Sequence, residues 1–142
     1  MTTNENEMTR YISETFPGVE TAKNFGYTFF FYRSDHKMPF ATLSASDNDY
    51  GRFSNLDRLG VFRLNIGVSK QTFQSLFGSE AIDARNYDFT ALDRIMPHPE
   101  YAAQQFICVL SPSEATFQTL RPMIAEAYDI AMKRNAKRES SK

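Results

Sequence analysis

The chain has 142 residues, 42% of them hydrophobic and 23% charged, which is the length and composition of one globular domain. Its formal net charge is −1, without the excess of Lys and Arg that proteins neutralising several phosphates carry, so the composition argues against nucleic-acid binding. A single cysteine excludes an intramolecular disulfide, and no stretch approaches the ~18 apolar residues of a membrane span. We expect a cytoplasmic monomer or homodimer without membrane partners.

The first third of the chain predicts one helix followed by three strands. Apolar residues recur at helical spacing over residues 4–16, and Pro17-Gly18 ends that helix. Short runs of aromatic and β-branched residues then favour strands over helices, and we place them at residues 19–24, 28–33 and 40–46.

A polar connection over residues 47–60 leads to the clearest strand, residues 61–68. Apolar and polar side chains alternate along this strand, so one face is predicted to be buried. Arg63 and Asn65 share the opposite face with Gly67.

A short helix and an irregular segment follow. Ser69 is a suitable N-cap for a helix that Gly78 ends. Beyond it, we expect Thr90 to cap a short turn over residues 91–95, which the Pro97-His98-Pro99 segment closes.

The last part of the chain predicts a strand over residues 105–110 and a long helix with Ser113 as its N-cap. Cys108 lies in the apolar strand and is expected to be a small buried hydrophobe. Pro122 interrupts the helical stripe, so we expect a kink or a break there. From about Asn135 we expect a frayed end.

This order of elements predicts one α+β domain over residues 1–142, with an ordered core at about 8–134 and a frayed tail at 135–142. The fold class is a single, mostly antiparallel sheet with helices packed on it, in the order α-β-β-β-β-α-β-α.

Four segments carry a resemblance to the MmcQ/YjbR-like proteins, and the chain looks closest to a bacterial family of unknown function within or near that group. The segments are Phe16-Pro17-Gly18-Val19 with Phe25-Gly26, Lys37 to Ala41, Leu56 to Val68, and Asp93 to Tyr101. Phe106 and Ala127 depart from the larger group, which commonly has Trp and Ser there. The resemblance implies the fold, and a DNA-binding "double wing" role described for the group, but no established reaction or cofactor.

A polar cluster around the strand at 61–68 is the candidate ligand-binding site. Arg63 and Asn65 emerge side by side, and a guanidinium beside an amide is suited to carboxylate or phosphate oxygens. In this interpretation His98 reaches the same area from its stiff loop and titrates near neutral pH. The alternative is a structural network in which Arg63 pairs with Asp57 or Asp93 and His98 only caps a turn. The complete cluster is Asp57, Arg58, Arg63, Asn65, Asp93, Arg94 and His98.

Other motifs are weaker. The segment 47–51 resembles a calcium loop but lacks the required spacing of ligands, and two histidines with one cysteine are too few for a structural zinc site. The run Phe29 to Tyr32 is either a base-stacking platform or, as we prefer, part of the core.

Two classes of function remain. The first is a non-enzymatic binding module for a small anionic ligand or a protein partner, without a cofactor. The second is an enzyme in which His98 is the acid or base and Arg63 holds an anionic substrate. Nucleic-acid binding is a further alternative that rests on the family resemblance and that the charge does not favour.

Overall fold

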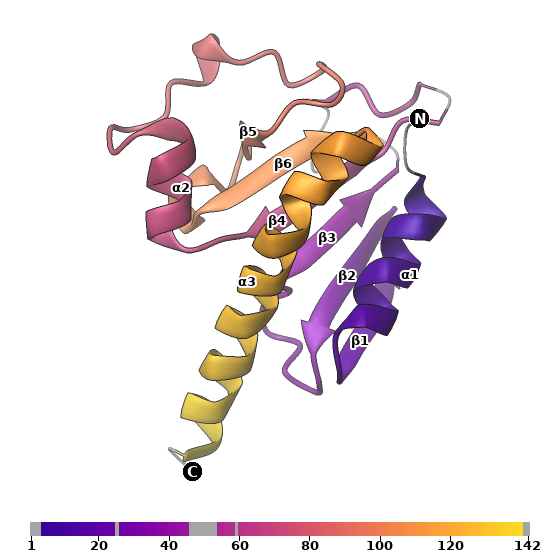
Figure 1. Ribbon diagram of the computed structural model, residues 1–142, viewed down its shortest axis with the longest axis vertical. Coiled ribbons are helices and arrows are strands. Elements are labelled where there is room, and N and C mark those ends of the chain that lie inside the picture. Colours follow the sequence, from indigo (N-terminus) through magenta and orange to yellow (C-terminus); the bar gives the residue numbers. More distant parts are fainter. Residues whose placement is uncertain (1–3, 25, 46–53, 59, 141–142) are drawn as a thin grey trace.

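The computed structural model describes residues 4–24, 26–45, 54–58 and 60–140 (Figure 1). Helix α1 (Glu5–Thr15) begins after Asn4, whose side-chain oxygen accepts a hydrogen bond from the Glu7 amide. Its stripe of apolar residues places Met8 and Ile12 in the core, as the helical spacing predicts.

Six strands form one antiparallel sheet in the order β1-β2-β3-β4-β6-β5. The expected α+β class with one antiparallel sheet is therefore confirmed. The strands are β1 (Val19–Asn24), β2 (Tyr27–Tyr32), β3 (Ala41–Ser44), β4 (Arg63–Gly67), β5 (Met96–Pro97) and β6 (Phe106–Leu110).

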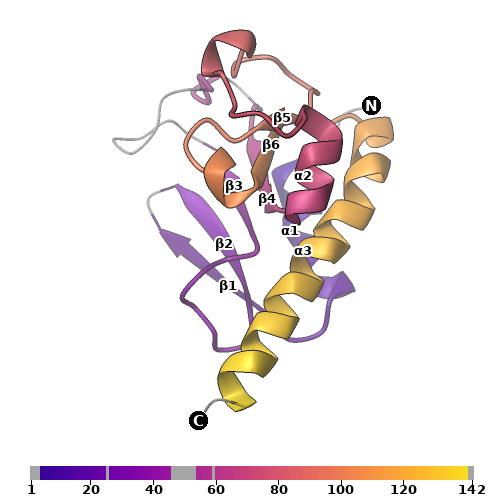
Figure 2. The same ribbon diagram turned by 90° about the vertical axis from the view of Figure 1, so that its left-hand side faces the viewer.

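One face of the sheet is covered by α1 and by the long helix α3 (Glu114–Ser140), which lie on the same side (Figures 1 and 2). Every second residue of a strand points to this face, and Leu64 and Ile66 of β4 pack there against Leu120 and Ile124. The short helix α2 (Lys70–Phe77) adds Phe73 to this core.

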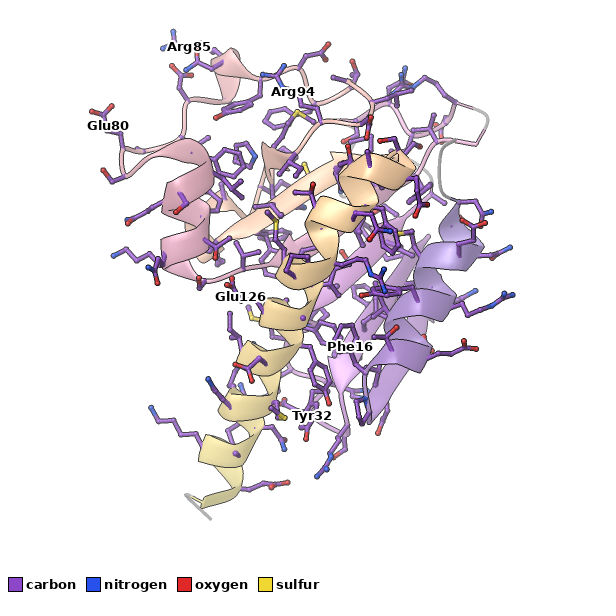
Figure 3. The ribbon with its side chains drawn as sticks, in the orientation of Figure 1. Phe16, Tyr32, Glu80, Arg85, Arg94 and Glu126 are labelled. Atoms are coloured by element: carbon purple, nitrogen blue, oxygen red, sulfur yellow. The ribbon has the colours of Figure 1, made fainter. Side chains whose placement is uncertain are left out.

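Helix α2 is attached to α3 through a carboxylate. Glu126 accepts hydrogen bonds from the Ser69 amide at 2.7 Å and from the Thr72 hydroxyl at 2.8 Å. Ser69 itself caps α2 through a bond from the Thr72 amide, as predicted. Figure 3 labels Glu126 on the side of α3 that faces α2.

We call the opposite side of the sheet the outer face. The register places Phe29, Thr42, Asn65, Cys108 and Met96 in one line across it, from β2 to β5. Over β5 and β6 this face is covered by a second apolar cluster that takes side chains from residues 54–61 and 87–89. Its members are Leu56, Val61, Tyr87, Phe89, Met96, Cys108 and Leu110.

The segment before β5 differs from the prediction. Thr90 does not cap a helical turn over residues 91–95; its amide and hydroxyl instead donate to the Asp88 carboxylate. Asp88 and Thr90 thus form a local side-chain turn, which competes with helix formation. A 3-10 turn, η1 (Ala84–Asn86), lies before β5, and a second one, η2 (Ala102–Gln104), lies between β5 and β6.

Helix α3 is continuous through Pro122, so the predicted break is wrong. Pro122 removes the donor for the Gln118 carbonyl, but both residues lie on the exposed side of the helix, where water is able to hydrate that carbonyl. The helix also continues to Ser140, beyond the frayed end expected from Asn135, and Arg138 forms a salt bridge with Asp35.

No helix within the described ranges is long and apolar enough to cross a bilayer. The segment at 47–51, with its superficial likeness to a calcium loop, lies outside the described residues.

Candidate functional site

A cavity of about 570 Å³ lies over the part of the outer face that the second apolar cluster leaves uncovered. Apolar and aromatic side chains from three separate parts of the chain form most of its lining. The lining residues are Tyr27, Phe29, Met38, Pro39, Thr42, Asn65, His98, Glu100, Tyr101, Gln104 and Phe106.

Asn65 and Thr42 are paired across neighbouring strands in the cavity lining. The Asn65 Nδ2 atom donates to Thr42 Oγ1 at 2.9 Å, and this bond fixes the amide plane. Asn65 is only 1% exposed, and its Oδ1 has no hydrogen-bond partner among the described residues. A buried acceptor without a donor costs about 1–3 kcal/mol, so such a group calls for an explanation, and a bound ligand or water is one.

His98 follows β5 directly, and its amide extends the β5–β6 ladder by donating to the Phe106 carbonyl. Its Nδ1 accepts from the amides of Glu100 and Tyr101, each at 3.0 Å. Because Nδ1 must be unprotonated to accept these bonds, the proton of the neutral ring is on Nε2. The predicted alternative in which His98 caps a turn is therefore confirmed.

The expected titration of His98 near neutral pH is wrong. Burial lowers the pKa of His98 to about 3, with a smaller contribution from the positive charge of Arg63. The side chain is 4% exposed, so an imidazolium there would lose most of its hydration. His98 is a neutral hydrogen-bond donor throughout the physiological range.

Phe106 forms a wall of the cavity because β4 ends in a glycine. Gly67 pairs with Phe106 in the register, and a Cβ added to Gly67 would lie 3.0 Å from Phe106 Cζ. The ring therefore lies against bare backbone, which is a recognised use of glycine within a strand. His98 contacts both Phe106 and Tyr101 through ring faces or edges, at centroid distances of 6.4 and 4.9 Å.

The opposite wall comes from β2. Tyr27, Phe29 and Phe31 stack in a row, with centroids 5.8 and 6.1 Å apart, and His36 stacks on Phe31 at 4.3 Å. The preferred core assignment of this run is confirmed for Phe30, Phe31 and Tyr32, which are buried. Phe29 is half-buried, and it shares the outer face with Phe31.

Arg63 is on the outer face with Asn65, but other side chains bury it there. It is 2% exposed, and its Nη1 donates to Ser54 Oγ at 2.9 Å. Its Nε and the Oγ of Ser44, its neighbour in the register, have no hydrogen-bond partner within the described part of the chain. Arg63 does not belong to the described cavity lining.

The remaining predicted site residues are dispersed. Arg58 donates to backbone carbonyls, including that of Thr90, and so ties two connections together. Asp93 accepts from the Ser113 amide at 2.7 Å ahead of α3, and this bond is the main cause of its lowered pKa. Asp57 is exposed, and Arg94 lies on the connection before β5 (Figure 3). The structure thus brings together Asn65 and His98 from the predicted cluster.

Cys108 lies in the same line as Asn65 but belongs to the second apolar cluster. Burial raises the pKa of its thiol to about 12, so it behaves as the predicted small hydrophobe and not as a nucleophile.

Sequence reasoning did not select Thr42, Gly67 or Phe106 as site residues. Thr42 and Gly67 carry a weak signal, because each lies in a strand at a position that shares a face with Asn65. Nothing local marks Phe106, since its role depends on the bare backbone of Gly67 across the ladder.

Within the described residues, no group of three or more His, Cys, Asp or Glu side chains is placed to hold a metal ion. No curated protein and no solved structure matches the chain. The comparisons provide no link to the MmcQ/YjbR-like proteins. A family model described as a family of unknown function (DUF6194) matches residues 1–140, and the chain therefore belongs to that family.

Proposed function

We propose that this chain is a non-enzymatic binding module that takes a small, neutral, largely aromatic ligand into the cavity on the outer face. The observation that carries the proposal is the composition of the lining, in which buried polar groups of Asn65 and His98 interrupt a mostly aromatic and apolar wall. Small-molecule sites typically have this composition, with volumes of ~300–1,000 Å³, and the cavity of about 570 Å³ falls in that range.

The charge distribution supports a neutral ligand over the anionic one expected from the sequence. Arg63 is the residue that we expected to bind an anion. Its side chain donates to Ser54 and does not contribute to the described lining of the cavity. His98 is neutral because of its lowered pKa, and Glu100 places a carboxylate at the exposed rim. An anion entering the cavity would meet the Glu100 carboxylate, and none of the described lining residues is a cation that offsets its desolvation.

The protonation states support binding over catalysis. General acid–base catalysis is most effective when the pKa of the catalytic group lies near the working pH. The pKa of His98 is about 3 and that of Cys108 is about 12, so neither group changes its protonation readily near neutral pH.

A fluorescent probe tests the proposal. N-phenyl-1-naphthylamine is neutral and aromatic, and its emission rises in apolar surroundings. We expect saturable binding to the wild-type chain and at least tenfold weaker binding to Thr42→Phe, whose ring fills the cavity from its lining. Thr21→Phe is the matched control, because Thr21 is exposed on β1 and does not line the cavity.

Amide shifts in a ¹H–¹⁵N spectrum of the wild-type chain locate the probe independently of any variant. The proposal requires shifts around Thr42, Asn65 and Phe106. Absence of saturable binding, or shifts confined to the surface of α1 and α3, would contradict it.

Nucleic-acid binding, by analogy with the MmcQ/YjbR-like double-wing fold, is the alternative that we set against this proposal. The stacked row of Tyr27, Phe29 and Phe31 favours it, because bases stack on aromatic rings. However, Phe31 is only 7% exposed, and the net charge of −1 opposes phosphate binding. Salt-sensitive retardation of single-stranded DNA in a gel would favour the alternative.

A further inference from the structure

We infer that the ligand presents a carboxamide, or the equivalent edge of a lactam, to His98 and Asn65, with its aromatic body between the β2 and Phe106 walls. This inference rests on the proposed function and specifies the chemical class of the ligand. It follows from the complementary hydrogen-bonding groups that the lining holds in fixed orientations.

The donor is the Nε2–H group of His98. The other ring nitrogen already accepts two backbone N–H bonds, so the tautomer is fixed and the ring cannot present an acceptor to the ligand. Within the described chain no acceptor is bonded to Nε2, and His98 lines the cavity. A ligand carbonyl oxygen supplies the acceptor that this group lacks.

The acceptor is Oδ1 of Asn65. Its own amide nitrogen donates to Thr42, which leaves the oxygen without a partner among the described residues. It is buried, lacks a donor among the described residues, and belongs to a side chain in the lining. A ligand N–H group supplies this donor and removes the penalty of an unpaired buried acceptor.

A carboxamide carries both complementary groups and no charge. A carboxylate has acceptors only, so it would place an oxygen against Asn65 Oδ1 and would also lose hydration on entry. A ketone accepts from His98 but leaves Asn65 unpaired. Sites with fixed buried polar groups discriminate strongly against analogues that leave one group unpaired.

The two flat walls suit an aromatic body. Tyr27 and Phe29 provide stacked faces on one side, and Phe106 is held against Gly67 on the other. Exposed apolar side chains at the mouth, Met38 at 42% and Tyr101 at 53%, extend these walls outward.

Three probes of one shape test the inference: 2-naphthamide, 2-acetonaphthone and 2-naphthoate. Their dissociation constants are measured from ¹H–¹⁵N spectra of the full chain at neutral pH. We expect 2-naphthamide to bind at least tenfold more tightly than 2-acetonaphthone, and 2-naphthoate to bind most weakly.

Variants assign the two bonds separately. Asn65→Leu should weaken 2-naphthamide by about tenfold or more and change 2-acetonaphthone by less than about threefold, because only the amide donates to Oδ1. His98→Leu should weaken both neutral probes, and His98→Gln, which keeps an N–H donor, should recover part of the loss. Ser44→Ala is the matched control, because it removes another unpaired buried polar atom of this face that does not line the cavity.

The ranking of the three naphthyl probes is measured on the wild-type chain, so it does not depend on whether any variant folds. The carboxamide inference is overturned if 2-naphthoate binds as tightly as 2-naphthamide, or if Asn65→Leu weakens the amide and the ketone equally. In either case, binding of N-phenyl-1-naphthylamine still decides whether the cavity takes a neutral ligand. If neither that probe nor any naphthyl compound binds, the proposed function and this inference both fail.

Discussion

Because His98 is buried as a neutral ring, the stability of the fold should depend on pH. In the unfolded chain, a histidine has a pKa of about 6.5, whereas in the folded chain burial lowers the pKa of His98 to about 3. Between these values the unfolded chain binds one more proton than the folded chain. Acidification therefore favours unfolding, and the stabilisation present above about pH 6.5 is lost as the pH falls towards 3.

The size of this effect follows from the separation of the two pKa values. Each pH unit between 6.5 and 3 costs ~1.4 kcal/mol, so at about pH 4.5 the loss attributable to His98 is roughly 3 kcal/mol. This is a large fraction of the stability of a typical domain, which is ~5–15 kcal/mol.

Urea denaturation of the wild-type chain and of His98→Gln, from about pH 7 to about pH 4.5, isolates the effect. The other ionisable groups are common to both proteins, so their contributions cancel in the difference. We expect the wild-type chain to lose about 2–3 kcal/mol more than the variant over this range. A pH-independent difference, or a nuclear magnetic resonance titration of His98 with its midpoint near 6.5, would refute the assignment of a buried neutral imidazole.

Three further predictions test the walls, the long helix and the buried thiol. Gly67→Ala should displace the Phe106 ring and weaken N-phenyl-1-naphthylamine binding by at least about threefold. It should also destabilise the chain by about 1–2 kcal/mol, because crowding against the ring outweighs the lower unfolded-state entropy of alanine. Unchanged affinity would contradict the role of that wall. Pro122→Ala should raise the free energy of unfolding by about 2 kcal/mol, because it restores a donor to the Gln118 carbonyl in a continuous helix. Urea denaturation measures this change, and a destabilised variant would indicate that the proline sets the helix geometry. Native Cys108 should react with a thiol reagent only as fast as the chain unfolds, and rapid modification would show that the strand is open.

The alternation of side chains was sufficient to predict which residues share the outer face. In β4 the apolar positions face the helices and Arg63 and Asn65 face the other way, as their spacing indicates. The caps at Ser69 and Ser113 were also predictable, because N-caps depend on a few adjacent residues.

The difference between Arg63 and Asn65 was not predictable from β4 alone. Arg63 is buried and donates to Ser54 on the connection before β4, whereas Asn65 lines the cavity. Which polar residue is covered depends on how the irregular connections fold back on the sheet, and their sequences carry no periodic signal. The pKa of His98 depends on the same covering, so a near-neutral value was the natural expectation for an isolated histidine.

Pro122 shows a similar limit. The steric rule for proline predicted an interruption, but its cost depends on whether the freed carbonyl is exposed or buried. That depends on the rotation of α3 against the sheet, which places Pro122 on the exposed side.

A crystal structure of the chain with 2-naphthamide would test the central claim most directly. The account predicts the naphthyl ring between Phe29 and Phe106, with the amide oxygen within about 3.2 Å of His98 Nε2 and the amide nitrogen within about 3.2 Å of Asn65 Oδ1. An empty cavity at saturating probe, or an amide turned towards Glu100 at the mouth, would contradict it.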